Sequence, residues 1–130
     1  MELLDLMLAR VEQANPAINA VVTLDAELAR EAARAADDAA PVERGVLHGL
    51  PMTIKDAFEV VGMTASCGLP DFVQHRPLRD ADAVARLRAA GAIPFGKSNV
   101  PVLPVRRGRS LRGRPAGLCR HAAAGRRPGG

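Results

Sequence analysis

The chain has 130 residues, two cysteines, no Trp or Tyr and three Phe, and its formal net charge is +4. This length suits one small domain, a single cysteine pair excludes a disulfide scaffold, and so few aromatic rings argue against nucleic-acid binding by base stacking. The charge is uneven, since residues 1–103 hold ten Lys and Arg against all fourteen Asp and Glu, whereas residues 104–130 hold eight Arg and no acid.

The N-terminal segment is predicted to be an amphipathic helix. Leu4, Leu8 and Val11 recur at helical spacing, which places them on one face. Asn15–Pro16 should end this helix, because a residue that precedes proline is pushed out of the α region. The acids in the segment, Glu2 among them, argue against a secretory signal peptide. Since no apolar run in the chain approaches the ~20 residues that span a bilayer, we expect a cytoplasmic protein that makes no membrane contact.

A strand and a second helix are predicted next. The short β-branched run from Ile18 to Leu24 is typical of a strand. Asp25 is a suitable N-cap for a helix over residues 25–40, which are rich in strong helix formers. The apolar face of this helix is mostly alanine, which suits either close packing or an exposed helix.

The middle of the chain predicts a strand, a loop and a third helix. The strand is "MTIK", residues 52–55, and residues 62–74 have the composition of a loop without apolar periodicity. Asp80 is the predicted N-cap of the helix and Gly91 its C-terminal cap. Val84 and Leu87 are expected on the inward face of this helix.

A further strand completes a strand–helix–strand unit. It comprises "IPFG", residues 93–96, and Pro94 places it near a sheet edge or at the start of the strand. Because such units pair their strands in parallel, we predict an α/β domain over residues 1–103.

Residues 104–130 differ in composition from the rest of the chain. Arg, Gly, Ala and Pro dominate this segment, and the apolar periodicity stops. Burial could not offset the conformational entropy of ordering such a segment, so we predict a disordered basic tail. In a second interpretation, the eight arginines bind nucleic-acid phosphates or anionic surfaces through a contact that is independent of sequence.

Lys55 is the residue of clearest chemical interest, because it ends a short apolar strand. Folds of the α/β class place their sites at strand ends. A lysine in a dry site loses the water that stabilises its charge and can then accept a proton from a neighbouring hydroxyl, as in Ser–Lys pairs. The ordinary alternative is a solvated lysine at the point where a strand leaves the sheet.

Other reactive residue types have simpler interpretations. His48 is predicted to be a turn residue without a catalytic role, because no partner for it is indicated. Ser66 and Ser98 do not lie on a strand–turn–helix elbow, so turn or capping roles are favoured over a nucleophilic one. Lys97 is expected to make a structural contact.

The acids and the cysteine of this region are also predicted to be structural. Asp80 and Asp82 are placed at a helix start, where the helix dipole favours negative charge. Asp56 either orients Lys55 or simply ends the strand, and the sequence leaves both alternatives open. Cys67 is predicted to be an ordinary buried or half-buried thiol.

Two stretches of the sequence resemble the amidase signature family. They are "GVLHGLPMTIKDAFEVVGMTASCG" and "RDADAVARLRAAGAIPFGKSNVP", and a weaker likeness begins at "INAVVTLDAELAREA". The resemblance implies a mixed β-sheet flanked by helices and the hydrolysis of a carboxylic amide by a Ser–cis-Ser–Lys triad, with neither metal nor cofactor. It implies that Lys55 is the triad base and that the substrate is a small-molecule amide. Because the chain has few aromatic rings and its basic charge is confined to residues 104–130, we expect no specific nucleic-acid partner.

The likeness stops abruptly after about Leu103. The two serines of the family lie in a "GGSSGGS"-type segment, and no such segment occurs in this sequence. Arg-rich composition without lysine is what GC-rich codons give in the wrong register, so we hypothesise a frameshift near codons 102–104. We therefore expect this chain to lack amidase activity. Sequencing of the coding DNA tests the hypothesis, which fails if neither alternative frame restores such a segment.

Overall fold

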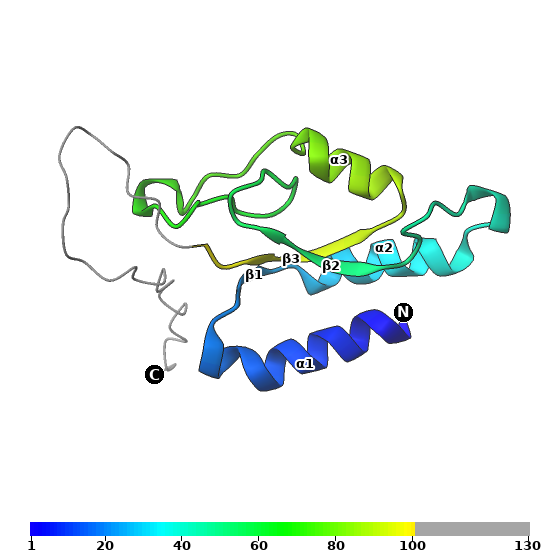
Figure 1. Ribbon diagram of the computed structural model, residues 1–130, viewed down its shortest axis with the longest axis horizontal. Coiled ribbons are helices and arrows are strands. Elements are labelled where there is room, and N and C mark those ends of the chain that lie inside the picture. The colour runs from blue at the N-terminus through cyan, green and yellow to red at the C-terminus, as the bar shows by residue number, and fades with distance from the viewer. Residues whose placement is uncertain (101–130) are drawn as a thin grey trace, which may run out of the picture.

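The computed structural model describes residues 1–100, in which three helices and a three-stranded sheet form three layers. In Figure 1, α1 and α2 lie on one side of the sheet and α3 lies on the other. The elements are α1 (Glu2–Ile18), β1 (Val21–Leu24), α2 (Ala26–Asp38), β2 (Pro51–Lys55), α3 (Asp82–Ala89) and β3 (Ile93–Ser98), with short 3-10 helices at Pro41–Glu43 and Pro70–Phe72. The predicted boundary at residue 103 and the predicted disordered tail fall outside the described residues.

The sheet has the strand order β1-β3-β2 and is mixed. Strand β3 pairs in parallel with β2 and antiparallel with β1. The strand–helix–strand unit predicted from the sequence is therefore confirmed as β2–α3–β3, and so are the α/β class and the mixed sheet.

Apolar side chains form a separate cluster on each face of the sheet. One cluster joins α1, α2 and β3 and consists of Leu4, Leu8, Ala29, Ala33, Ile93 and Phe95. The other lies beneath α3 and consists of Ile54, Val60, Met63 and Val84. The alanine face of α2 thus serves close packing, because Ala29 and Ala33 are buried against α1 and β3.

The first helix continues past the predicted stop at Pro16 and ends at Ile18. The side chain of Asn15 holds this last turn against the sheet. Its Nδ2 donates to the carbonyl oxygen of Val21 at 2.8 Å, and its Oδ1 accepts from the Val21 N–H at 2.8 Å. Each such bond contributes about 0.5–1.5 kcal/mol, against the ~3 kcal/mol that a proline costs in a helix interior. The strand consequently starts at Val21 rather than at the predicted Ile18.

The predicted N-cap of α2 is confirmed. Asp25 Oδ1 accepts a hydrogen bond from the Leu28 N–H at 3.1 Å, which satisfies one of the donors left open at a helix start.

We expect Asp25→Ala to lower the free energy of unfolding by about 1 kcal/mol, measured by urea denaturation. Glu31→Ala, at an exposed position of the same helix, is the control and should change stability by less than about 0.5 kcal/mol. Equal stability of the two variants would contradict the capping role.

The predicted N-cap of α3 was wrong, whereas its C-terminal cap is confirmed. Helix α3 starts after Ala81, with no side-chain cap. Asp80 instead accepts from the Val61 N–H at 2.7 Å and pairs with Arg88 at 3.0 Å, so it fastens the loop after β2 to the helix. Gly91 has a φ of +94°, the left-handed conformation that glycine supplies at the end of a helix.

Strand β3 lies in the centre of the described sheet, not near its edge. The alternative position for Pro94, at the start of a strand, is the one observed. The β2–β3 register shifts at this point, since Met52 pairs with Pro94 and Thr53 pairs with Gly96. Such an irregularity in the pairing is where a strand tolerates proline, which has no N–H to donate to the neighbouring strand.

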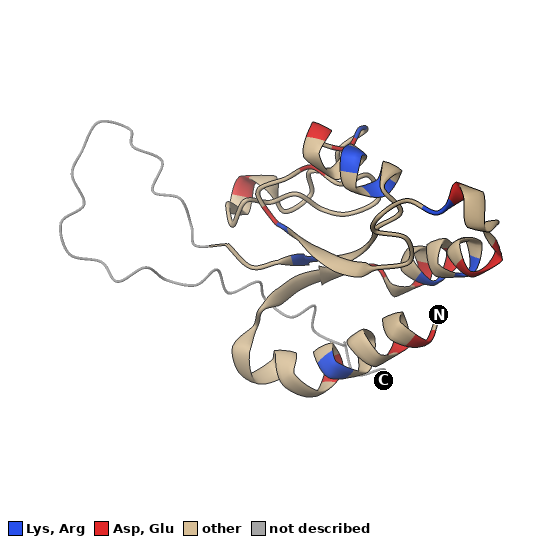
Figure 2. Ribbon diagram, turned by 45° about the vertical axis from the view of Figure 1, so that its right-hand side comes forward, with Lys and Arg blue, Asp and Glu red and all other residues tan. Residues whose placement is uncertain are grey.

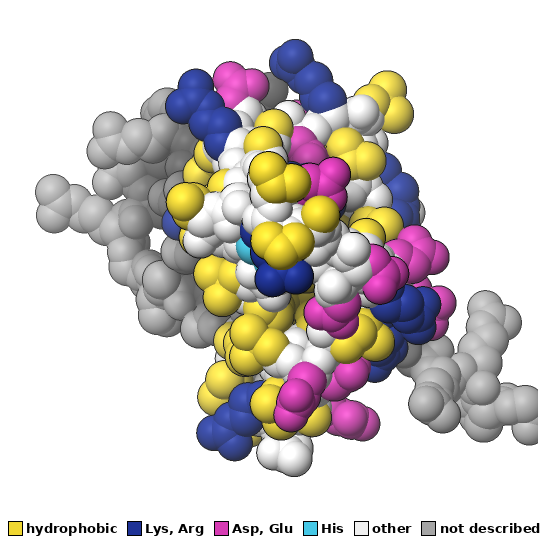
Figure 3. All heavy atoms as spheres, turned by 90° about the vertical axis from the view of Figure 1, so that its right-hand side faces the viewer, with side chains coloured by type: hydrophobic (Ala, Val, Ile, Leu, Met, Phe, Trp, Pro, Cys, Tyr) yellow, Lys and Arg dark blue, Asp and Glu magenta, His cyan; other side chains and the backbone are white. Residues whose placement is uncertain are grey.

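The surface of the described residues carries both signs of charge. Acidic and basic residues are interspersed along the helices (Figure 2). Apolar side chains also reach the surface among the charged ones (Figure 3), and Val42 and Val46 in the connector before β2 are more than 90% exposed. No helix within residues 1–100 is long and apolar enough to cross a bilayer.

Candidate active site

Lys55 is the last residue of β2, and its side chain is exposed. It pairs in register with Ser98, the last residue of β3, so two parallel strands end side by side at this point. The preceding residue, Ile54, is buried beneath α3, and strand alternation turns Lys55 to the other face of the sheet. Among residues 1–100, no hydrogen bond or ion pair engages its ammonium group.

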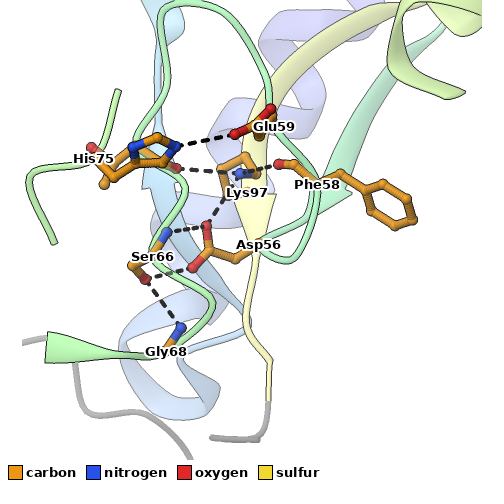
Figure 4. A network of polar contacts seen from close by, with 8 residues as sticks. Asp56, Phe58, Glu59, Ser66, Gly68, His75 and Lys97 are labelled. Carbon is orange, nitrogen blue, oxygen red and sulfur yellow. Dashed lines mark hydrogen bonds and ion pairs between the residues drawn. The ribbon is translucent and has the colours of Figure 1, made fainter. Parts of the chain in front are cut away.

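Asp56 follows Lys55 directly but is 1% exposed and binds other residues. Its Oδ1 accepts from Lys97 Nζ at 3.2 Å and from the Ser66 N–H at 3.3 Å. Its Oδ2 accepts from the Ser66 hydroxyl at 2.6 Å (Figure 4). The Asp56 carboxylate therefore pairs with Lys97 and, among residues 1–100, makes no direct contact with the Lys55 ammonium.

Lys97 is fully buried in β3, with 0% of its surface exposed. Besides Asp56, its ammonium donates to the carbonyl oxygens of Phe58 at 2.8 Å and Thr64 at 3.3 Å. An ammonium group has three protons to donate, and each of them here has an acceptor. The predicted structural contact of Lys97 is confirmed, and its ammonium is fully committed to these partners.

Ser66 and Ser98 occupy different positions. Ser66 accepts from the Gly68 N–H at 3.2 Å, which confirms a role in a turn, and its bond to Asp56 links that turn to β3 through Lys97. Ser98 belongs to β3 rather than to a turn or a cap, and its carbonyl oxygen accepts from the Asp56 N–H at 3.0 Å.

The remaining candidates occupy the structural positions predicted for them. His48 lies in a turn that its N–H closes with the Gly45 carbonyl at 3.0 Å. Asp82 is exposed and is the first residue of α3. Cys67 is a half-buried thiol. Residues 1–100 contain no group of three or more His, Cys, Asp or Glu that could hold a metal ion.

The cluster of Asp56, Ser66 and Lys97 was missed as a unit by sequence reasoning. Two signals for it exist in the sequence. Lys97 follows a continuously buried apolar run in β3, and an acid directly follows the neighbouring parallel strand. Once those strands are placed in register, a charge pair at their common end is the arrangement that avoids a lone buried charge.

Comparison with known proteins finds relatives for most of the described residues. The family model "Amidase" matches residues 2–105. A glutamyl-tRNA(Gln) amidotransferase chain of Nitratidesulfovibrio vulgaris (strain DP4) is 48% identical over 96 residues, which are 72% of this chain and 19% of that protein. This chain spans about a fifth of the length of the curated relatives that it matches.

Solved structures agree with the sequence relatives. One amidase is 41% identical, with a TM-score of 0.65, over 79% of this chain and 24% of its own. The peptide amidase of Stenotrophomonas maltophilia is 33% identical, also with a TM-score of 0.65, over 75% of this chain and 20% of its own.

Proposed function

Because the chain belongs to the amidase family, we propose that it provides the lysine-bearing part of an amide hydrolase, with Lys55 as the catalytic base. One observation carries this assignment. The sequence has only two lysines, and the ammonium of Lys97 is buried with all of its donors engaged. Lys55 is exposed at the strand end, where its amine can approach a proton donor. A general base must come within hydrogen-bond reach of the proton that it removes.

The proposed reaction is acyl transfer through a covalent intermediate. The Lys55 amine takes a proton from a bridging serine, which takes the proton of a nucleophilic serine as that oxygen attacks the amide carbon. The C–N bond breaks, the proton passes back to the leaving nitrogen, and ammonia or an amine departs. Water then cleaves the acyl–serine ester to give the acid and restores both hydroxyls. The substrate class is therefore a carboxylic amide, and we propose a cytoplasmic setting.

Both serines must come from outside this sequence, which contains no Gly- and Ser-rich segment of the required kind. The backbone N–H groups that would form the oxyanion hole beside the serines are also outside this sequence. Loss of one such donor typically lowers kcat by ~10²–10³-fold. The 130-residue chain alone is accordingly proposed to be inactive.

A chimeric protein, called the graft below, tests the assignment. Residues 1–100 replace the matching segment of the solved amidase that is 41% identical, and release of ammonia from simple amides is measured. We expect the graft to hydrolyse amides and the 130-residue chain to release no ammonia above a blank. A graft that is folded by circular dichroism yet inactive would contradict the proposed function. Hydrolysis by the chain alone would contradict the external origin of the serines.

The alternative function is binding through the eight arginines of residues 104–130, which contain no acid. Charge alone gives a contact that is independent of sequence, and it should be lost almost entirely between about 50 and 200 mM salt. Fluorescence anisotropy with two unrelated oligonucleotides measures this. A preference for one of them that persists at the higher salt would favour a nucleic-acid-binding module.

A further inference from the structure

We propose that Asp56, Ser66 and Lys97 form a positioning cluster that fixes the place of Lys55 at the carboxyl end of β2. The proposal rests on the proposed role of Lys55 as the base. None of the three cluster residues is assigned a contact with substrate. They act through the backbone that carries Lys55.

The cluster holds the turn in which Lys55 is the first residue. The Lys55 carbonyl oxygen accepts from the Phe58 N–H at 3.0 Å, which closes a four-residue turn. Lys97 binds this turn at two points. Its ammonium donates to the carboxylate of the second turn residue, Asp56, and to the carbonyl oxygen of the last turn residue, Phe58. The Asp56 N–H also donates to the Ser98 carbonyl at 3.0 Å, which ties the turn to β3.

The far end of the following loop returns to the same ammonium. Lys97 donates to the Thr64 carbonyl oxygen, and the hydroxyl and N–H of Ser66 donate to the Asp56 carboxylate. The Cys67 N–H donates to the Asp56 carbonyl at 3.2 Å. The chain from Asp56 to Cys67 is thus folded around one buried charge pair (Figure 4).

Stability alone is a poor explanation for this charge pair. Burying an ion pair costs several kcal/mol of desolvation per ion, and well-packed apolar residues of similar volume are often as stabilising. The cluster instead fixes the backbone conformation of the turn, because hydrogen bonds are directional and these reach atoms near both ends of the turn. A displacement of about 1 Å in a reacting group can cost ~10²-fold in rate, so a lysine base benefits from a backbone that cannot shift.

The first test uses the full 130-residue chain. Ser66→Ala removes the hydroxyl that binds Asp56 while it leaves the Asp56–Lys97 pair in place, and Thr64→Val is the control because it removes a hydroxyl from the same loop. We expect Ser66→Ala to speed amide hydrogen exchange at Asp56 and Phe58 at least about tenfold relative to Thr64→Val. Exchange at Ala29 and Ala33 in α2 should be unchanged. Equal exchange at Asp56 and Phe58 in the two variants would overturn the proposal.

The second test asks whether Ser66 acts through Lys55. In the graft described above, Ser66→Ala is expected to lower kcat per folded molecule about 10- to 100-fold with KM unchanged. The same substitution should cause no further loss when Lys55→Arg is already present, because a positioning residue has nothing left to position. A merely structural role would give the same loss in both backgrounds and would overturn the proposal.

Failure of the positioning role is distinguishable from failure of the proposed function. If Lys55→Arg lowers kcat but Ser66→Ala does not, Lys55 is the base and the positioning role is wrong. If Lys55→Arg leaves kcat unchanged, the proposed function is itself wrong, and the positioning role falls with it.

Discussion

The Lys55→Arg substitution is expected to lower kcat of the graft about 10²–10⁴-fold, the contribution typical of a general base. Arginine keeps the positive charge and nearly the length of lysine, but its guanidinium stays protonated in proteins and cannot accept a proton. The substitution therefore separates the proton-accepting role of Lys55 from a purely electrostatic one. Initial rates of ammonia release at saturating amide give kcat directly.

Folding is not expected to contribute to this loss. Lys55 is exposed and makes no side-chain bond among the described residues, and surface substitutions of that kind change stability by about 0.5 kcal/mol or less. In the 130-residue chain, the thermal midpoint of Lys55→Arg should match that of the parent, and kcat of the graft is expressed per folded molecule. Glu31→Ala, exposed on α2, should retain full activity. A Lys55→Arg graft that retains more than about a tenth of the parent kcat would exclude Lys55 as the base.

The secondary structure was predictable where the signals were local. The spacing of Leu4 and Leu8, the cap at Asp25 and the glycine at position 91 each depend on neighbours within a few residues, and each prediction was confirmed. Prediction failed where a contact made outside the helix overrode the local rule. Pro16 did not stop α1, because the Asn15 side chain binds the backbone of Val21.

The candidate site was predictable in part for the same reason. A lysine at the end of a short apolar strand is visible in the sequence, and β2 ends at Lys55. The partner of Asp56 was not visible, because Lys97 lies 41 positions away and reaches it only once β2 and β3 are paired. The surroundings of Lys55 beyond residues 1–100 stay a prediction from the family.

The Lys97→Met substitution is expected to lower the free energy of unfolding of the full chain by about 3–5 kcal/mol, the cost of breaking a buried ion pair by removing one partner. Methionine fills much of the same volume, so the loss does not come from a cavity. It comes from the Asp56 carboxylate, which is 1% exposed and, of its partners within residues 1–100, would keep only Ser66. Urea denaturation followed by circular dichroism measures the change.

Removing the second charge as well should restore part of that stability. In Asp56→Asn/Lys97→Met the buried carboxylate is replaced by a neutral amide that still accepts from Ser66, so we expect the double variant to be more stable than Lys97→Met alone. Arg30→Met is the control, since Arg30 pairs with Asp5 at 3.3 Å on the surface, and an exposed pair contributes about 0–1 kcal/mol. If Lys97→Met were no more destabilising than Arg30→Met, the Asp56–Lys97 pair could not be what holds the loop after β2 in place.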